Sequence, residues 1–139
     1  QAVKAAYAAH GCHATVQPFF NDMAVQYHSA DIIICRAGAT TVAEITAIGK
    51  AALFVPFPFA ADNHQELNAK TLVDRDAAEM IRQTDLNGTV LARKIKYFMS
   101  HAEALNQLAI KAKKLGRPEA AEDIVTACYA MHGKRLKNH

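Results

Sequence analysis

The sequence of 139 residues contains no apolar run near the length of about 20 residues that a membrane-spanning helix needs. It also lacks internal repeats, low-complexity tracts and a flexible linker that would divide the chain. Hydrophobic residues make up 51% of the chain and charged residues 21%, which excludes a disordered tail. The sequence therefore predicts one globular domain that spans residues 1–139.

Cysteine and net charge are also scarce. The three cysteines, Cys12, Cys35 and Cys128, are widely spaced and form neither a Cys-x-x-Cys pair nor a Cys/His cluster, so we expect structural thiols and no metal site. The net charge is only +3, and its visible source is the tail of residues 133–139. A solvated terminus explains this tail about as well as contact with anionic lipid or nucleic acid.

Common catalytic motifs are missing. No G-x-G-x-x-G, Walker A or G-x-S-x-G pattern occurs, which removes support for dehydrogenase, P-loop and hydrolase functions. The histidines other than His64 have no acidic partner at a recognisable spacing. The residues therefore favour binding over bond-making chemistry, and we assign no catalytic residue.

Strand and helix patterns alternate along the chain. Strands are predicted at residues 14–18, 31–35, 51–56 and 77–81. Helices are predicted at residues 1–11, 22–29, 41–48, 63–75, 86–101, 102–115 and 119–131. The second and third strands are continuous apolar runs, typical of strands buried on both faces. This order predicts an α/β fold with a Rossmann-like parallel sheet and helices on both faces.

Ligands of parallel sheets bind outside the carboxyl ends of the strands. This rule selects the loops 19–23, 36–41 and 57–65 before any motif is considered.

The loop after the second strand has small side chains around Gly38, Ala39, Thr40 and Thr41. The first N–H groups of a helix have no partner within it and lie at its positive end, so an anion such as phosphate would be stabilised here. In the alternative interpretation, Gly38 only permits a tight turn and Thr40 only caps the helix.

Glu44 has two possible roles. It follows Thr41 by three residues, so Thr41-Val42-Ala43-Glu44 fits a capping box in which the carboxylate folds back onto the helix start. Alternatively, the carboxylate accepts hydrogen bonds from ribose hydroxyls, as acidic residues do beside nucleotides. The spacing does not separate these roles.

The other two loops carry polar and aromatic candidates. His64 and Gln65 open a helix and suit hydroxyl-rich ligands, because amide and imidazole groups both donate and accept hydrogen bonds, although a polar first turn is also common in solvent. Phe19 and Phe20 could flank a planar base or belong to the core.

Four motifs together resemble a known family. F-F-N-D-M at 19–23, A-D-I-I-I-C-R-A-G-A-T-T-V-A-E-I at 30–45, G-K-A-A-L-F-V-P-F-P at 49–58 and D-N-H-Q-E-L-N-A at 62–69 are similar, in order and spacing, to the C-terminal half of the MurG family. These bacterial enzymes transfer N-acetylglucosamine (GlcNAc) from UDP-GlcNAc to lipid I and give lipid II for peptidoglycan. The resemblance covers nearly the whole chain and implies the donor-binding half of a two-domain GT-B glycosyltransferase.

The resemblance also implies roles for individual residues. Backbone groups of Ala39, Thr40 and Thr41, after Gly38, would hold the diphosphate, and Glu44 would bind the ribose. The remaining positions would bind the base and the sugar: Phe20 meets the uracil through its backbone, Phe19 and Met23 shape that pocket, and His64 and Gln65 reach the sugar hydroxyls. Members often have Ser at the position of Ala37 and some have Gln at that of His64.

The family's N-terminal acceptor domain and a second Gly-rich phosphate loop are not in this sequence, so we expect the chain alone to bind UDP-GlcNAc weakly and to transfer nothing. The intact enzyme would invert the anomeric centre without a metal or other cofactor, on the inner face of the plasma membrane, where it meets lipid I; no nucleic acid is implied.

Other assignments stay open. The helix that begins at Gln1 has no capping residue, which favours a piece of a longer enzyme. The alternatives are a stand-alone donor-binding subunit that needs a separate acceptor-binding partner, and a related UDP-sugar glycosyltransferase or 2-epimerase.

Overall fold

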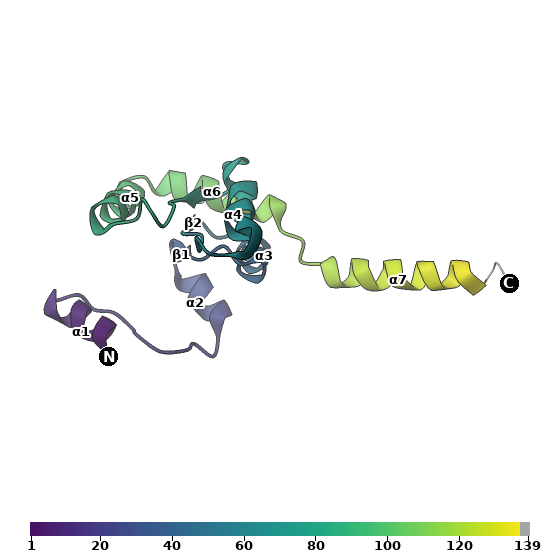
Figure 1. Cartoon of the computed structure of the whole chain (residues 1–139), viewed down its shortest axis with the longest axis horizontal. Helices are drawn as coiled ribbons and strands as arrows, with labels where there is room; N and C mark the ends of the chain where they lie inside the picture. The colour runs from purple at the N-terminus through teal and green to yellow at the C-terminus, as the bar shows by residue number, and fades with distance from the viewer. Residues whose placement is uncertain (137–139) are drawn as a thin grey trace.

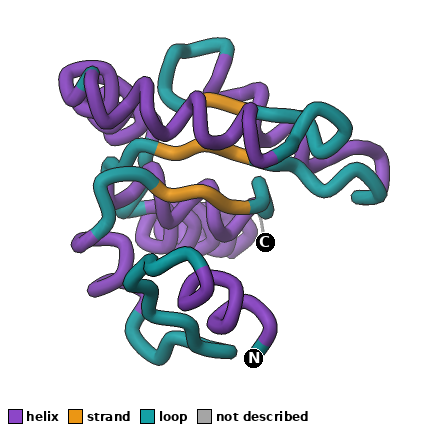
Figure 2. Tube along the Cα trace, turned by 90° about the vertical axis from the view of Figure 1, so that its left-hand side faces the viewer, coloured by secondary structure: helices purple, strands orange, loops and turns teal. Residues whose placement is uncertain are grey.

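The computed structural model describes residues 1–136, with side-chain environments up to His132, so the basic tail of residues 133–139 lies outside the side chains described. The sheet has three parallel strands in the order β1 (Ile33–Cys35), β2 (Ala52–Phe54) and β3 (Glu79–Met80), which lie side by side in Figure 2. The helices are α1 (Ala2–Ala9), α2 (Met23–Ser29), α3 (Ala39–Ile48), α4 (His64–Val73), α5 (Gly88–Ser100), α6 (Ala102–Leu115) and α7 (Ala120–Leu136), and a 3-10 turn, η1 (Ala61–Asn63), precedes α4. The α/β class with a parallel sheet is confirmed.

The central strand β2 is buried on both faces, as its apolar sequence predicts. Ala52, Leu53 and Phe54 are fully buried, and successive side chains of a strand point to opposite faces. In register, Ile33 pairs with Ala52 on one side, and Leu53 pairs with Glu79 on the other. Both faces of the sheet are therefore covered at its centre.

The edge strand β1 differs from its prediction. Its side chains change from buried Ile33 to Ile34, which is 41% exposed, and then to partly buried Cys35. The prediction of burial on both faces is therefore wrong for this strand. The apolar run is the same as in a central strand, but β1 has only β2 beside it within the described residues.

The main core lies between β2 and the helices α3, α4 and α6. Phe54 from β2, Ile45 from α3, Leu72 from α4 and Ala112 from α6 belong to one buried cluster. The alanines of α4 and α6 let the helices approach closely, and α3 and α6 form the most extensive pair of packed helices. This packing holds α3 in place over the sheet, with its first residue after the carboxyl end of β1.

Most helix boundaries follow their local signals. Asp22 caps α2 by accepting a hydrogen bond of 3.1 Å from the backbone N–H of Val25. Helix α3 ends at Gly49, which has a left-handed φ of 71°, and α6 ends before Gly116, as predicted. These ends are set by short-range capping and turn chemistry.

The predicted strand at 14–18 is wrong. Residues 12–17 have no regular secondary structure and lead from α1 to α2 as an extended loop (Figure 1). Val16 is the single partly buried residue between Gly11 and Phe19. A β-rich sequence forms a strand only where a neighbour completes its hydrogen bonds, and among residues 1–136 this segment pairs with none.

The two terminal helices stand apart from the sheet. In Figure 1, α7 extends away from the body of the molecule, and α1 lies at the end of the loop on the other side. No side chain of α1 is buried, and residues 121–132 of α7 are all exposed. Among the described residues, no helix is both long enough and apolar enough to span a bilayer.

Candidate functional site

The start of α3 presents unpartnered backbone donors at the carboxyl edge of the sheet. The helix begins at Ala39, two residues before the predicted start, with Gly38 as its N-cap. No side chain caps it, so the N–H groups of Ala39, Thr40 and Thr41 have no hydrogen-bond acceptor within the described chain. Such N–H groups, at the positive end of the helix, can bind an anion.

The glycine before this helix is not required by the backbone. Gly38 has φ −65°, which any residue adopts. A Cβ atom at this position would meet nothing closer than Thr41 Oγ1 at 3.9 Å. The tight-turn interpretation of Gly38 is therefore wrong. The capping interpretation of Thr40 is also wrong, because Thr40 lies inside α3 and makes no capping hydrogen bond. The absence of a side chain at Gly38 leaves the backbone N–H groups uncovered.

Glu44 does not form a capping box. Its Oε2 accepts a hydrogen bond of 3.0 Å from the Tyr27 hydroxyl, and no side chain caps α3. Because α3 begins two residues early, Thr41 lies inside the helix and cannot be the N-cap that the box requires. Burial, and next the hydrogen bond to Glu44, raise the pKa of Tyr27 from 10.0 to about 12, so its hydroxyl stays protonated to a more alkaline pH than a free tyrosine does.

Residues 36–41, which follow β1 and include the start of α3, are called the elbow here, and a side chain from α4 contacts this segment. Asn68 Nδ2 donates a hydrogen bond of 3.1 Å to the carbonyl oxygen of Ala37, which is fully buried. Arg36 makes a second link, because its guanidinium donates to the carbonyl oxygens of Val55 and Pro56 at 3.0 and 3.1 Å. The loops after β1 and β2 are thus held together by specific hydrogen bonds.

His64 and Gln65 lie at the start of α4, on this same edge. Gln65 Oε1 accepts a hydrogen bond of 3.0 Å from the backbone N–H of Phe57, so its amide orders the loop and keeps its NH₂ group available. His64 Nδ1 lies 2.7 Å from the carbonyl oxygen of Ala61, which favours the tautomer with the proton on Nδ1 and leaves Nε2 exposed as an acceptor.

The aromatic residues before α2 are not part of the core. Phe19 is 74% exposed and Met23 is 39% exposed, whereas Phe20 is partly buried. No hydrogen bond among the described residues joins these three positions to the elbow. The structure therefore brings together the elbow and the start of α4, and it leaves the 19–23 loop without a direct link to them.

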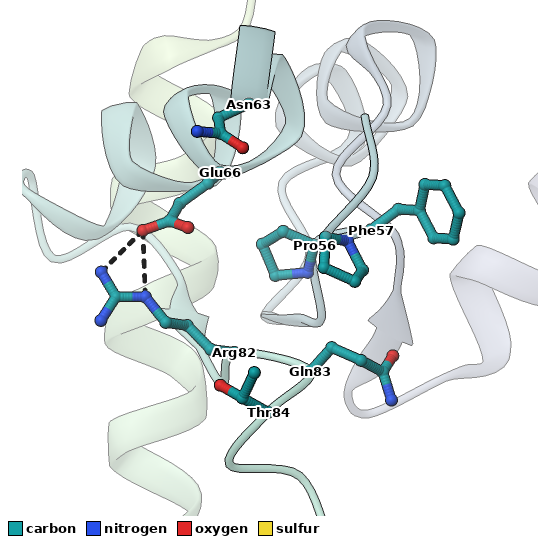
Figure 3. A pocket seen from close by; sticks show the side chains of 8 residues that line it. Pro56, Phe57, Asn63, Glu66, Arg82, Gln83 and Thr84 are labelled. Carbon is teal, nitrogen blue, oxygen red and sulfur yellow. Dashed lines mark hydrogen bonds and ion pairs between the residues drawn. The ribbon is translucent and has the colours of Figure 1, made fainter. Parts of the chain in front are cut away.

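A shallow pocket beyond the carboxyl ends of β2 and β3 includes residues that the predicted site does not contain. Figure 3 shows its lining from the carboxyl ends of β2 and β3 and the start of α4: Pro56, Phe57, Pro58, Asn63, Glu66, Arg82, Gln83 and Thr84. Two nitrogens of Arg82 donate to Glu66 Oε1 at 3.0 and 2.7 Å, and this contact lowers the pKa of Glu66. The sequence contains a signal for Arg82, Gln83 and Thr84, because the polar run 82–85 directly follows a predicted strand.

Tyr27 and Asn68 were missed for another reason. Each lies inside a helix, and the hydrogen-bond partners are 17 and 31 residues away, so no local sequence pattern indicates the contact.

Together, the residues at the carboxyl edge of the sheet offer backbone donors, an ordered carboxylate, an amide and an imidazole. This set suits a ligand with both an anionic group and neutral hydroxyl groups. Within residues 1–136, no cluster of His, Cys, Asp and Glu is arranged as a metal site.

Residues 1–124 match the C-terminal domain of glycosyltransferase family 28. The chain belongs to this family. The family 28 domain is 52% identical, over 94% of its length, to a UDP-N-acetylglucosamine--N-acetylmuramyl-(pentapeptide) pyrophosphoryl-undecaprenol N-acetylglucosamine transferase of Syntrophus aciditrophicus. It is 50% identical, over 90% of its length, to the protein of the same name from Trichlorobacter lovleyi.

A solved structure agrees with these sequence relatives. The crystal structure of Acinetobacter baumannii MurG superposes on 91% of the family 28 domain with a TM-score of 0.82 and 41% sequence identity. The domain covers 38% of that chain, and 36% and 33% of the two sequence relatives. It therefore spans about a third of the length of the proteins it matches.

Proposed function

We propose that the chain is the UDP-GlcNAc-binding domain of an N-acetylglucosaminyltransferase that converts lipid I to lipid II. The observation that carries this proposal is the uncovered start of α3, where Gly38 leaves the N–H groups of Ala39, Thr40 and Thr41 open without being needed by the fold. A diphosphate is the anion that fits several adjacent N–H donors at a helix N-terminus. The names of the two sequence relatives supply the uridine nucleotide, the sugar and the acceptor.

The ligand's parts divide among the loops of the carboxyl edge. The diphosphate lies at the start of α3. Glu44, farther along the same helix, accepts hydrogen bonds from the ribose hydroxyls. Phe19, Phe20 and Met23 form the uracil pocket, with Phe20 bound through its backbone. His64 Nε2 and the NH₂ group of Gln65 reach the sugar hydroxyls, since their other polar atoms are used within the loop.

The chain supplies the donor half of the reaction. The acceptor hydroxyl attacks the anomeric carbon, the bond to the diphosphate breaks with inversion, and UDP leaves. The N-terminus of α3 stabilises the charge that grows on the diphosphate, so the mechanism needs no metal. The catalytic base that deprotonates the acceptor hydroxyl and the lipid I site belong to an acceptor domain outside this sequence. The intact enzyme works at the cytoplasmic face of the plasma membrane.

The test is nucleotide selectivity of the chain itself. We expect UDP and UDP-GlcNAc to raise the melting temperature more than ADP or GDP at equal concentration, because a ligand that binds only the folded state stabilises it. Equal shifts for the three nucleoside diphosphates would remove the uridine assignment. Inorganic pyrophosphate serves as a control for binding through the anion alone.

A substitution at Glu44 tests the ribose contact. Glu44→Ala is expected to weaken UDP binding by roughly 1–3 kcal/mol, because it leaves ribose hydroxyls without their acceptor. It should leave pyrophosphate binding unchanged. A melting temperature close to that of the unaltered chain would agree with the absence of a capping role.

A further inference from the structure

Tyr27 and Glu44 belong to different helices and meet through one hydrogen bond. The side chain of Tyr27, on α2, is partly buried and packs against the main core. Its hydroxyl donates to Glu44 Oε2 at 3.0 Å. The phenol is thus anchored at its ring, and the carboxylate is held by a group that cannot itself move far.

The stability of the fold does not require this bond. Glu44 is exposed, caps no helix and takes part in no ion pair among the described residues. An exposed hydrogen bond of this kind contributes little to folding. Its main physical effect is to fix the carboxylate of a long side chain that would otherwise rotate freely in water.

The direction of that carboxylate fits the proposed ligand. Glu44 lies five residues beyond Ala39, which corresponds to about 7.5 Å along the helix axis. Long side chains of a helix lean toward its N-terminus, so the carboxylate of Glu44 lies back toward the anion-binding end. Tyr27 occupies Oε2 and leaves Oε1 free to accept further hydrogen bonds.

We propose that Tyr27 is a positioning residue, whose hydroxyl holds Glu44 so that Oε1 receives the vicinal hydroxyls of a ribose attached to a diphosphate at the start of α3. This inference rests on the proposed function and adds to it a residue that sets the preference for ribose. Tyr27 itself does not touch the nucleotide. Removal of the Tyr27 hydroxyl lets the carboxylate of Glu44 rotate. The binding free energy from each hydrogen bond to a ribose hydroxyl then falls.

The experiment measures the affinities of UDP, 2′-deoxy-UDP and pyrophosphate for the full chain by calorimetry or NMR titration. The variants are Tyr27→Phe, Glu44→Ala and the double variant, with Tyr97→Phe as the matched control. Tyr97 is half exposed on α5, and its ring stacks on His101. Melting temperatures confirm that each variant folds.

Tyr27→Phe is expected to reduce the preference for UDP over 2′-deoxy-UDP by about two- to tenfold and to leave pyrophosphate binding unchanged. In the Glu44→Ala background, Tyr27→Phe should have no further effect, because the residue acts through the carboxylate. Tyr97→Phe should behave like the unaltered chain.

Three results overturn the inference. The first is an unchanged ribose preference in Tyr27→Phe while Glu44→Ala abolishes it, which leaves the proposed function intact. The second is an equal loss of affinity for all three ligands, which indicates a purely structural role. The third is an unaltered chain that binds UDP no better than 2′-deoxy-UDP, which removes the proposed ribose contact of Glu44 as well.

Discussion

The backbone of Gly116 lies directly against the carbonyl group of Thr46. A Cβ atom at residue 116 would stand 2.5 Å from the carbonyl oxygen of Thr46 and 2.8 Å from its carbon. Gly116 has φ −66°, so the glycine is required by this close approach and not by an unusual backbone angle. The contact brings the end of α6 onto the last turn of α3, the helix that begins in the elbow and carries Glu44.

Gly116→Ala should therefore lower the free energy of unfolding by about 1–3 kcal/mol, since the obstacle is backbone that cannot rotate away. Gly88→Ala is the matched control, because a Cβ atom there would meet nothing within 4 Å at the start of α5. We expect that control to be neutral or more stable by about 0.4–1 kcal/mol. Urea unfolding of both variants measures the difference, and equal stabilities would contradict the close contact.

Gly38 allows a test in which stability and binding move in opposite directions. The Cβ atom of Gly38→Asp would meet nothing closer than 3.9 Å, and Asp is a preferred N-cap, so the variant should be at least as stable as the unaltered chain. Its carboxylate occupies and repels the anion site, so binding of UDP and pyrophosphate should be lost. Gly38→Asn caps the helix without the charge and is expected to retain more affinity. Undiminished binding by Gly38→Asp would exclude a diphosphate at this helix.

The side chain of Asn68 should stabilise the fold through its hydrogen bond to the elbow. Its side-chain amide is the donor to the buried carbonyl oxygen of Ala37. Asn68→Ala leaves that carbonyl without this partner and should cost about 1–3 kcal/mol of unfolding free energy. Asn68→Asp should cost more, because an ionised carboxylate cannot donate and would face the carbonyl oxygen. Thermal unfolding at neutral pH checks the order, and an Asp variant as stable as the unaltered chain would contradict the hydrogen bond.

Tyr27 makes the stability depend on alkaline pH. The pKa of Tyr27 rises from 10.0 to about 12 in the fold, because burial and the nearby Glu44 disfavour the phenolate. The unfolded chain thus loses the phenolic proton first as the pH rises. The stabilisation is complete below pH 10 and is lost as the pH rises toward about 12.

Tyr27→Phe should consequently lose less stability than the unaltered chain over that interval. Burial also raises the pKa of Cys35 to about 11, and comparison of the two chains cancels this contribution. Urea unfolding at several alkaline pH values gives the stability, and a difference titration of phenolate absorbance gives the pKa of Tyr27 directly. A Tyr27 that ionises at its ordinary pKa would contradict the partial burial of its ring and its hydrogen bond to Glu44.

Local sequence determined much of this domain. The apolar run 51–56 identified the central strand, and α6 was predicted with the boundaries that it has, Ala102–Leu115. The loops 36–41 and 57–65 were selected from strand order alone, because the carboxyl ends of parallel strands share one edge. In the structure, Asn68 of α4, the helix that follows the second of these loops, donates a hydrogen bond to the carbonyl oxygen of Ala37 in the first loop.

Tertiary structure decided the features that depend on partners distant in the sequence. Residues 14–18 have strand-like composition but no strand beside them, and Ile34 is exposed because its strand lies at an edge of the described sheet. Glu44 had the spacing of a capping box, yet α3 begins at Ala39 and the carboxylate bonds to Tyr27. Periodicity and capping act over a few residues, so the sequence can report them. Strand pairing and the orientation of an exposed carboxylate are set by groups 17 or more residues away, which only the folded chain brings together.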